Sequence, residues 1–258
     1  MKIAAAQLTS VPADVPANTR RMADLAGRAR DRGAELLVFP ELAPTGYEPE
    51  AVRARRDLWL SADDPRLDAI RASGVACVVN CAAPSDRTRA GDGSGDGGED
   101  GERPVIGTFV FGADGELITS YRKQHLFEHE REVFAAGRSD GRFTLGGLRF
   151  ALATCFDNHF PELVARGADD GCQVHLASSL YGTGGGVDEL RTVYPNIART
   201  HGMYVVVANH VGPAGAWTGC GRSALWAPDG APLAQADAES TTVVVADVPP
   251  GHAGPGPA

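Results

Sequence analysis

The chain has 258 residues, of which 43% are hydrophobic and 22% are charged, and its formal net charge at pH 7 is -9. This length is sufficient for one sizeable α/β domain or two small ones, and the composition is ordinary for a soluble globular protein. Nucleic acid binding needs a concentrated basic surface, which mixed charges with an acidic excess do not supply. We therefore expect no nucleic acid partner.

The first seven residues combine one basic residue with a very short apolar stretch. A signal peptide needs a longer apolar region and a cleavage site. Along the chain, no apolar run approaches the roughly 20 residues that cross a bilayer. We read the start as a first β-strand, and we predict a cytoplasmic protein without a membrane partner.

Short β-rich runs alternate with longer amphipathic stretches. The expected strands are 2–8, 35–39, 75–81, 105–111, 117–121, 148–154, 173–178, 204–210, 222–227 and 242–247. The expected helices are 18–32, 64–72, 161–169 and 188–201, the first of them capped by Asn18 and ended by Gly33. Turn sequences at 111–116 and 227–231 indicate hairpins. The predicted fold class is therefore α/β with antiparallel elements.

The stretch 84–104 is rich in glycine and aspartate and contains few apolar side chains. It cannot bury enough surface to offset the entropy of ordering, so we expect a flexible loop inserted into a single domain of residues 1–248. Residues 249–258, rich in glycine and proline, form the expected flexible tail. Asp92, Asp96 and Asp100 raise the alternative of a calcium loop, but their spacing differs from that of an EF-hand.

The five cysteines are an odd number at wide spacings: Cys77, Cys81, Cys155, Cys172 and Cys220. Neither a disulfide framework nor a zinc site fits this distribution. Cys77 and Cys81 lie in an apolar run and would share one face of a strand as core residues. We expect no metal site.

Three reactive side chains each follow an apolar strand: Glu41, Lys123 and Cys155. In layered α/β proteins the ends of adjacent strands line the ligand crevice. A thiol with a pKa of about 8.5 needs a base to act as a nucleophile near neutral pH, and Glu41 becomes that base if burial raises its pKa. Lys123 and the backbone N–H of Phe156 would then stabilise the charge that forms when the thiolate attacks an amide or nitrile carbon.

The sequence resembles the nitrilase superfamily of carbon–nitrogen hydrolases through three motifs in the family's order. Residues 39–47 (FPELAPTGY) resemble its glutamate motif, 121–127 (YRKQHLF) its lysine motif, and 155–162 (CFDNHFPE) its cysteine motif. Residues 130–137 (EREVFAAG) resemble the stretch where the family keeps a second glutamate, which corresponds to Glu130. The likeness extends to the first strand and to 221–223 and 228–230, so it spans nearly the whole chain.

The resemblance implies a four-layer α-β-β-α sandwich that dimerises through helices. It also implies a Glu–Lys–Cys triad formed by Glu41, Lys123 and Cys155, a thioester intermediate, release of ammonia or an amine, and no cofactor. Glu130 would hold Lys123 and help to orient the substrate. The substrate would be a small amide or nitrile.

The pocket-facing residues predicted from these motifs and from the following strand are Tyr47, Phe156, His159, Ser179 and Tyr181. Many relatives carry arginine where this chain has His159, and many have a tryptophan-containing segment where this chain reads SSLYGTGGG from residue 178. The substrate is therefore not transferable from a well-studied branch. The first interpretation is an amidase for a small linear amide, ω-amide or N-carbamoyl compound.

Several alternatives remain open from sequence alone. A true nitrilase would use the same triad, and a non-catalytic relative would bind a small metabolite without needing an activated thiol. His125, His129 and His159 raise a cysteine–histidine dyad, which no protease-like spacing supports. Gly184, Gly185 and Gly186 fit a pocket wall better than a phosphate loop.

Overall fold

The computed structural model describes residues 1–85 and 103–249. Its strands are β1 (Lys2–Leu8), β2 (Leu36–Val38), β3 (Ala76–Ala83), β4 (Val105–Phe111), β5 (Leu117–Arg122), β6 (Gly141–Leu145), β7 (Leu148–Thr154), β8 (Val174–Ser179), β9 (Tyr204–Ala214), β10 (Trp217–Cys220), β11 (Ala224–Trp226), β12 (Pro232–Gln235) and β13 (Thr242–Asp247). The α-helices are α1 (Val15–Asp31), α2 (Pro49–Ala54), α3 (Asp68–Arg71), α4 (Glu130–Val133), α5 (Pro161–Asp169) and α6 (Gly185–His201). The 3-10 helix η4 (Cys155–His159) follows β7 directly.

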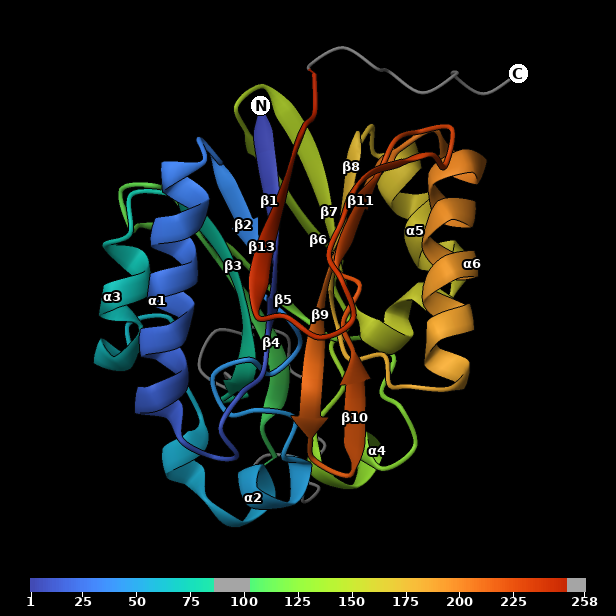
Figure 1. Ribbon diagram of the computed structural model, residues 1–258. Helices are drawn as coiled ribbons and strands as arrows, with labels where there is room; N and C mark the ends of the chain where they lie inside the picture. The colour runs from blue at the N-terminus through green and yellow to red at the C-terminus, as the bar shows by residue number, and fades with distance from the viewer. Residues whose placement is uncertain (86–102, 250–258) are drawn as a thin grey trace, which may run out of the picture.

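The strands form one mixed sheet with the order β5-β4-β3-β2-β1-β9-β8-β7-β6. β3, β2, β1, β9, β8 and β7 run parallel, whereas β4, β5 and β6 add antiparallel pairs. The sheet bends back on itself so that its two end strands approach each other. Helices α1 and α3 cover one half of the sheet and α5 and α6 cover the other (Figure 1). The result is the predicted α-β-β-α arrangement of four layers.

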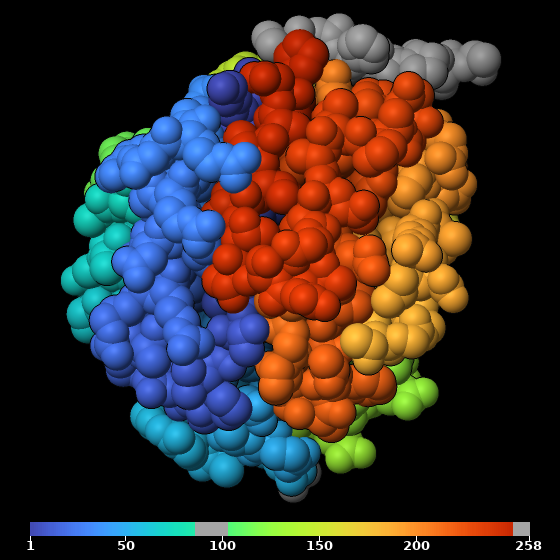
Figure 2. Space-filling view, in the orientation of Figure 1, coloured from blue at the N-terminus to red at the C-terminus, as the bar shows by residue number. Residues whose placement is uncertain are grey.

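The alternation of side chains along each strand explains how one sheet contributes to two separate hydrophobic clusters, one on each of its faces. Along β1, Ile3 and Ala5 belong to the cluster between the two halves of the sheet, and Ala4 and Ala6 belong to the cluster under α1. Successive side chains of a strand point to opposite faces. Because both faces are covered, every residue of β1 after Lys2 is buried, and all of these except Gln7 are apolar. The C-terminal strand β13 pairs with β1, and the space-filling view shows this late segment beside the N-terminal helix (Figure 2).

The structure corrects several predicted boundaries. Helix α1 begins earlier than residue 18, because Asp14 is its N-cap and accepts the backbone N–H of Ala17 at 3.0 Å. Asn18 lies inside the helix and uses its amide to bind backbone groups of Val11 and Pro44. The segment predicted as one helix over 64–72 divides into a 3-10 turn and the short helix α3. Strands β6 and β10 were not predicted as strands, whereas β12 pairs with β11 as the second strand of the hairpin predicted at 227–231.

No helix within residues 1–85 and 103–249 is long and apolar enough to span a membrane. Most of the predicted insertion at 84–104 and nearly all of the tail at 249–258 lie outside the described residues. The division into a single domain over 1–248 and a tail therefore stays a prediction.

Candidate active site

The ends of β2, β5 and β7 bring Glu41, Lys123 and Cys155 to one edge of the sheet. Glu41 follows β2 in a tight turn, in which the next residue, Leu42, has a φ of 50°. The Leu42 N–H donates to Asn80 Oδ1 at 2.8 Å, and His210 Nε2 donates to the Glu41 carbonyl at 2.6 Å. Burial lowers the pKa of His210 to about 4, so its ring is neutral at pH 7. These bonds fix the backbone that carries the Glu41 carboxyl.

Lys123 lies between two carboxylates, and all three side chains are fully buried. Its Nζ is 2.7 Å from Glu41 Oε1, and it contacts Glu130 Oε1 at 2.8 Å and Oε2 at 2.7 Å. Glu130 also accepts the Tyr47 hydroxyl at 2.7 Å and the Phe127 N–H at 2.7 Å. Since both oxygens of Glu130 already accept hydrogen bonds, this residue is arranged to hold Lys123 and Tyr47 in place.

The charges of these three residues depend on one another. Burial alone lowers the pKa of Lys123, but the adjacent Glu41 and Glu130 outweigh that effect and raise the pKa above its usual value. Lys123 is therefore an ammonium at any ordinary pH. Burial raises the pKa of Glu41 to about 7, against the opposing pull of Lys123. A carboxyl with such a pKa can exchange a proton near neutral pH.

One oxygen of Glu41 is free to take a proton. Oε1 accepts from Lys123, whereas the buried Oε2 has no hydrogen-bond partner. Glu41 and Cys155 lie close enough to shift each other's pKa, and burial together with the Glu41 charge raises the pKa of the Cys155 thiol well above its usual value. The resting group is therefore a thiol beside an unsatisfied carboxylate oxygen, which is the arrangement that a proton transfer from sulfur to oxygen requires.

Cys155 occupies a constrained turn between β7 and η4. Its φ of 45° is uncommon for a residue with a side chain, and such strain persists only where surrounding contacts hold it. Asn158 Nδ2 donates to the Cys155 carbonyl at 2.8 Å, and His175 contacts Asn158 Oδ1 at 2.7 Å. The N–H of Phe156 belongs to the first turn of η4, where N–H groups have no acceptor within the helix. That N–H is the one expected from the sequence to stabilise an oxyanion.

Asp157, which the sequence reasoning did not single out, joins the cysteine turn to the lysine loop. Its fully buried carboxylate accepts the Thr154 N–H at 3.0 Å on one side. On the other side it accepts the Tyr121 hydroxyl at 2.6 Å, the His125 N–H at 2.9 Å and His125 Nδ1 at 3.0 Å. Lys123 lies between Tyr121 and His125 in the chain, so Asp157 sets the position of Lys123 relative to Cys155.

We expect Asp157→Asn to lower kcat by about 10-fold to 100-fold with little change in KM, because an amide nitrogen cannot replace all the acceptors and small displacements of reacting groups are costly. Steady-state kinetics and thermal unfolding measure the two effects. Tyr121→Phe, which removes one of the hydrogen bonds, is the control and should lose less activity. A variant with lower thermal stability but unchanged kcat would show that Asp157 only stabilises the fold.

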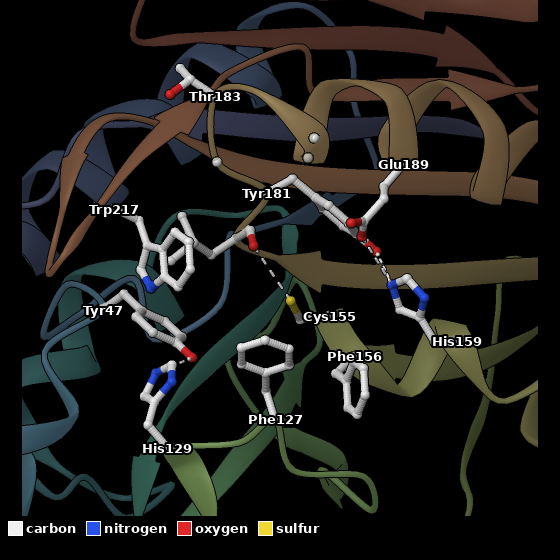
Figure 3. Close-up of a pocket in the computed structure, with 14 residues that line it drawn as sticks. Tyr47, Phe127, His129, Cys155, Phe156, His159, Tyr181, Thr183, Glu189 and Trp217 are labelled. Carbon is white, nitrogen blue, oxygen red and sulfur yellow. Dashed lines mark hydrogen bonds and ion pairs between the residues drawn. The ribbon is translucent and has the colours of Figure 1, made fainter.

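A cavity of about 310 Å³ opens over Cys155 (Figure 3). Of the predicted pocket residues, four line it, namely Tyr47, Phe156, His159 and Tyr181. Further lining residues that were not predicted are Phe127, His129 and Glu189, and the ring of Trp217 lines the cavity as well. Gly185 and Gly186 also line it, as expected for a pocket wall. Among the described residues, the lining is dominated by aromatic rings.

Ser179 is the predicted pocket residue that the structure places elsewhere. It is fully buried, and its hydroxyl is 2.9 Å from the Tyr194 hydroxyl under α6. The neighbouring Leu180 faces the site instead, and its carbonyl accepts the Cys155 thiol with an Sγ–O distance of 3.5 Å. The prediction for Ser179 was wrong because it named the segment without resolving which side chains of the strand end face the cavity.

The three histidines near the site have partners other than the thiol. His125 binds Asp157, His129 Nε2 is 3.2 Å from the Tyr47 hydroxyl, and His159 Nε2 is 3.3 Å from Glu189 Oε2. These contacts do not form a cysteine–histidine dyad. In the part of the chain that the structure describes, no group of three or more His, Cys, Asp or Glu residues is arranged to hold a metal ion.

Exposure distinguishes Cys155 from the other cysteines. Cys77, Cys81, Cys172 and Cys220 are buried, whereas Cys155 is partly exposed in the cavity. We expect iodoacetamide to alkylate Cys155 first and to abolish turnover in proportion, because reaction requires access and a nearby base. Peptide mass spectrometry after brief labelling measures the order of modification. Equal labelling of all five thiols would contradict this prediction.

Comparisons with known proteins agree with this geometry. A model of the carbon-nitrogen hydrolase family matches residues 2–257. An amidase from Nesterenkonia sp. AN1 is 29% identical and superimposes with a TM-score of 0.83, covering 97% of this chain and 91% of that chain. That structure is of a mutant whose active-site cysteine carries the acetamide moiety of fluoroacetamide, and a different mutant of the amidase is in complex with butyramide.

Curated relatives cover most of the chain as well. A nitrilase from Pyrococcus abyssi is 27% identical over 96% of this chain and 89% of its own length. A human omega-amidase is 23% identical over 92% of this chain and 84% of its own length. The family model matches nearly the whole chain, the fold is shared with a solved amidase, and Glu41, Lys123 and Cys155 lie together. The chain therefore belongs to the carbon-nitrogen hydrolase family.

Proposed function

We propose that this hydrolase is an amidase that cleaves a small linear amide through a thioester on Cys155. The single observation that carries the proposal is the buried Glu41 carboxyl: its Oε1 accepts from Lys123, its Oε2 has no hydrogen-bond partner besides the neighbouring thiol, and the group is close enough to Cys155 for each to shift the pKa of the other. The base Glu41, the nucleophile Cys155 and the cation Lys123 therefore lie next to one another before substrate binds. The amidase from Nesterenkonia sp. AN1, with its cysteine adduct and its butyramide complex, supports the choice of amides.

In the first half of the reaction, Glu41 accepts the thiol proton while Sγ attacks the amide carbon. The carbonyl π electrons move to oxygen, and the negative charge is stabilised by the Lys123 ammonium and the Phe156 N–H. The tetrahedral intermediate collapses as Glu41 returns the proton to the amide nitrogen. The C–N bond breaks, ammonia leaves, and the acyl group remains on Sγ as a thioester.

In the second half, Glu41 takes a proton from water, and the resulting hydroxide attacks the thioester carbon. Collapse of the second tetrahedral intermediate breaks the C–S bond, and the carboxylic acid product leaves. The sulfur recovers its proton from Glu41. Each cycle therefore consumes one amide and one water and returns the enzyme unchanged.

The test is ammonia release across short neutral amides, combined with intact-mass detection of an acyl adduct on Cys155. We expect turnover, and after rapid quenching a mass increase equal to the acyl group. Cys155→Ala should show neither. Turnover by Cys155→Ala, or turnover without any adduct on Cys155 under conditions where hydrolysis is slowed, would exclude the thioester mechanism.

A nitrile is the second candidate substrate, favoured by the nitrilase from Pyrococcus abyssi. The same thiol would add to the nitrile carbon, and Lys123 would face the nitrogen where charge develops. Nitriles matched in chain length to the amides belong in the same assay. Homodimer formation and a cytoplasmic location stay predictions.

A further inference from the structure

The far wall of the cavity carries a carboxylate. Glu189, in the first turns of α6, lines the pocket with its side chain 51% exposed, and its Oε2 lies 3.3 Å from Nε2 of His159, whose side chain is 31% exposed. Figure 3 shows Glu189, His159 and Tyr181 grouped on one side of Cys155. Glu189 is also close enough to Tyr181 to raise the pKa of that phenol, although burial is the larger cause. A bound substrate can reach this carboxylate, since half of it remains open.

The charge of the whole site is negative. At its base, the Lys123 ammonium faces two carboxylates, Glu41 and Glu130. Glu189 adds a third carboxylate, whereas His129 and His159 carry charge only when protonated. None of the described residues that line the cavity is arginine or lysine. A substrate tail that ends in a carboxylate therefore meets repulsion and no cationic partner, whereas a cationic tail is attracted.

The aromatic walls act in the same direction. The rings of Tyr47, Phe127, Phe156, Tyr181 and Trp217 surround the space above Cys155. Their apolar faces suit an alkyl chain, and the faces of such rings attract an ammonium group. An acyl chain with an amine at its end would thus pass between aromatic rings and reach a carboxylate.

We propose that Glu189 is a specificity-determining residue and that the preferred substrates are ω-amino amides, whose acyl chain ends in a primary ammonium group. This inference rests on the proposed amidase function and names its substrate class. Glu189 binds the distal ammonium, and His159 holds the Glu189 carboxylate in position at the rim. Substrates with a distal carboxylate are disfavoured.

The experiment compares amides of equal length that differ only in the end group. Butanoyl, pentanoyl and hexanoyl amides are prepared with a terminal methyl, ammonium or carboxylate group, and kcat/KM is measured from ammonia release at low salt. We expect the ammonium series to exceed the carboxylate series by about 10-fold or more at the best length, since Glu189, the site charge and the rings all act together. Added salt should reduce this ratio.

Two variants assign the preference to Glu189. Glu189→Gln should lower the ratio of ammonium to carboxylate substrates by about two- to fivefold, the effect of a partly exposed charge pair, and should change kcat/KM for the methyl series less than for either charged series. Glu189→Arg should lower the ratio further. Asp188→Asn is the matched control, because it removes the same charge from the adjacent position of α6 while Asp188 does not line the cavity. It should leave the ratio close to that of the parent protein.

The outcomes separate this inference from the proposed function. Turnover of the methyl series without an advantage for ammonium substrates would overturn the role of Glu189 and leave the amidase proposal intact. Equal effects of Glu189→Gln and Asp188→Asn would overturn it too, because the substrate preference would then come from the net charge of the region and not from Glu189. No turnover of any amide would contradict the amidase proposal itself. Calorimetry with Cys155→Ala measures binding of the same amides without hydrolysis, and there too the ammonium series should bind more tightly.

Discussion

Glu41→Gln is expected to lower kcat/KM by about 10³-fold, within the range typical of general acid–base catalysis. The substitution keeps the size of the side chain and an oxygen that can accept from Lys123. It removes the group that takes the proton from Cys155. Because burial raises the pKa of the thiol well above its usual value, little thiolate forms without that base.

The pH profile supplies a second readout of the same residue. In the proposed mechanism the active form of Glu41 is the carboxylate, and burial raises the pKa of this group to about 7. Activity of the parent protein should therefore rise as pH increases through about 7 and be lost below it. The residual activity of Glu41→Gln should not show this rise near pH 7.

Glu50→Gln is the control for Glu41→Gln, because Glu50 is exposed on α2 and pairs with Arg53. It should retain the activity and the pH profile of the parent protein. Stopped assays of ammonia release over a range of pH, at substrate concentrations well below KM, give the comparison. If Glu41→Gln kept the parent rate, another group would have to be the base.

Lys123→Met is expected to reduce both activity and stability. Loss of the charge that faces the oxyanion should lower kcat by about 10²-fold to 10³-fold. In the folded state it also leaves Glu41 and Glu130 buried without their shared cation. Removal of one partner from a buried ion pair costs about 3–5 kcal/mol in the free energy of unfolding. Kinetics and urea unfolding measure the two losses.

A double variant separates these two effects. Lys123→Met combined with Glu130→Gln removes one uncompensated carboxylate and should recover part of the unfolding free energy without recovering turnover. The chain contains one other lysine, the exposed Lys2, so Lys2→Met is a matched control for loss of an ammonium. Full activity in Lys123→Met would show that this ammonium does not stabilise the transition state.

The proximity of Glu41, Lys123 and Cys155 could be predicted from the sequence because each follows an apolar strand at a recognisable motif. Parallel strands place their carboxyl ends along one edge of a sheet, so the order of strands and motifs was enough to expect Glu41, Lys123 and Cys155 together. The alternation of side chains between the two faces of strands such as β1, and the end of α1 near Gly33, could also be predicted. Both depend on interactions between residues that are close in the sequence.

Tertiary structure decided what depends on contacts between distant segments. The hydrogen bonds of Asp157 to Tyr121 and His125, the free oxygen of Glu41, and the position of Ser179 outside the pocket all arise from how loops meet. Asn18 looked like a helix cap because its side chain suits that role, but its amide instead binds the backbone of another loop. In the sequence Glu189 does not differ from other charged helix residues, and only the packing of α6 brings its side chain to the cavity. Sequence determines which groups are present and the local backbone they favour, whereas packing of distant segments determines what each group faces.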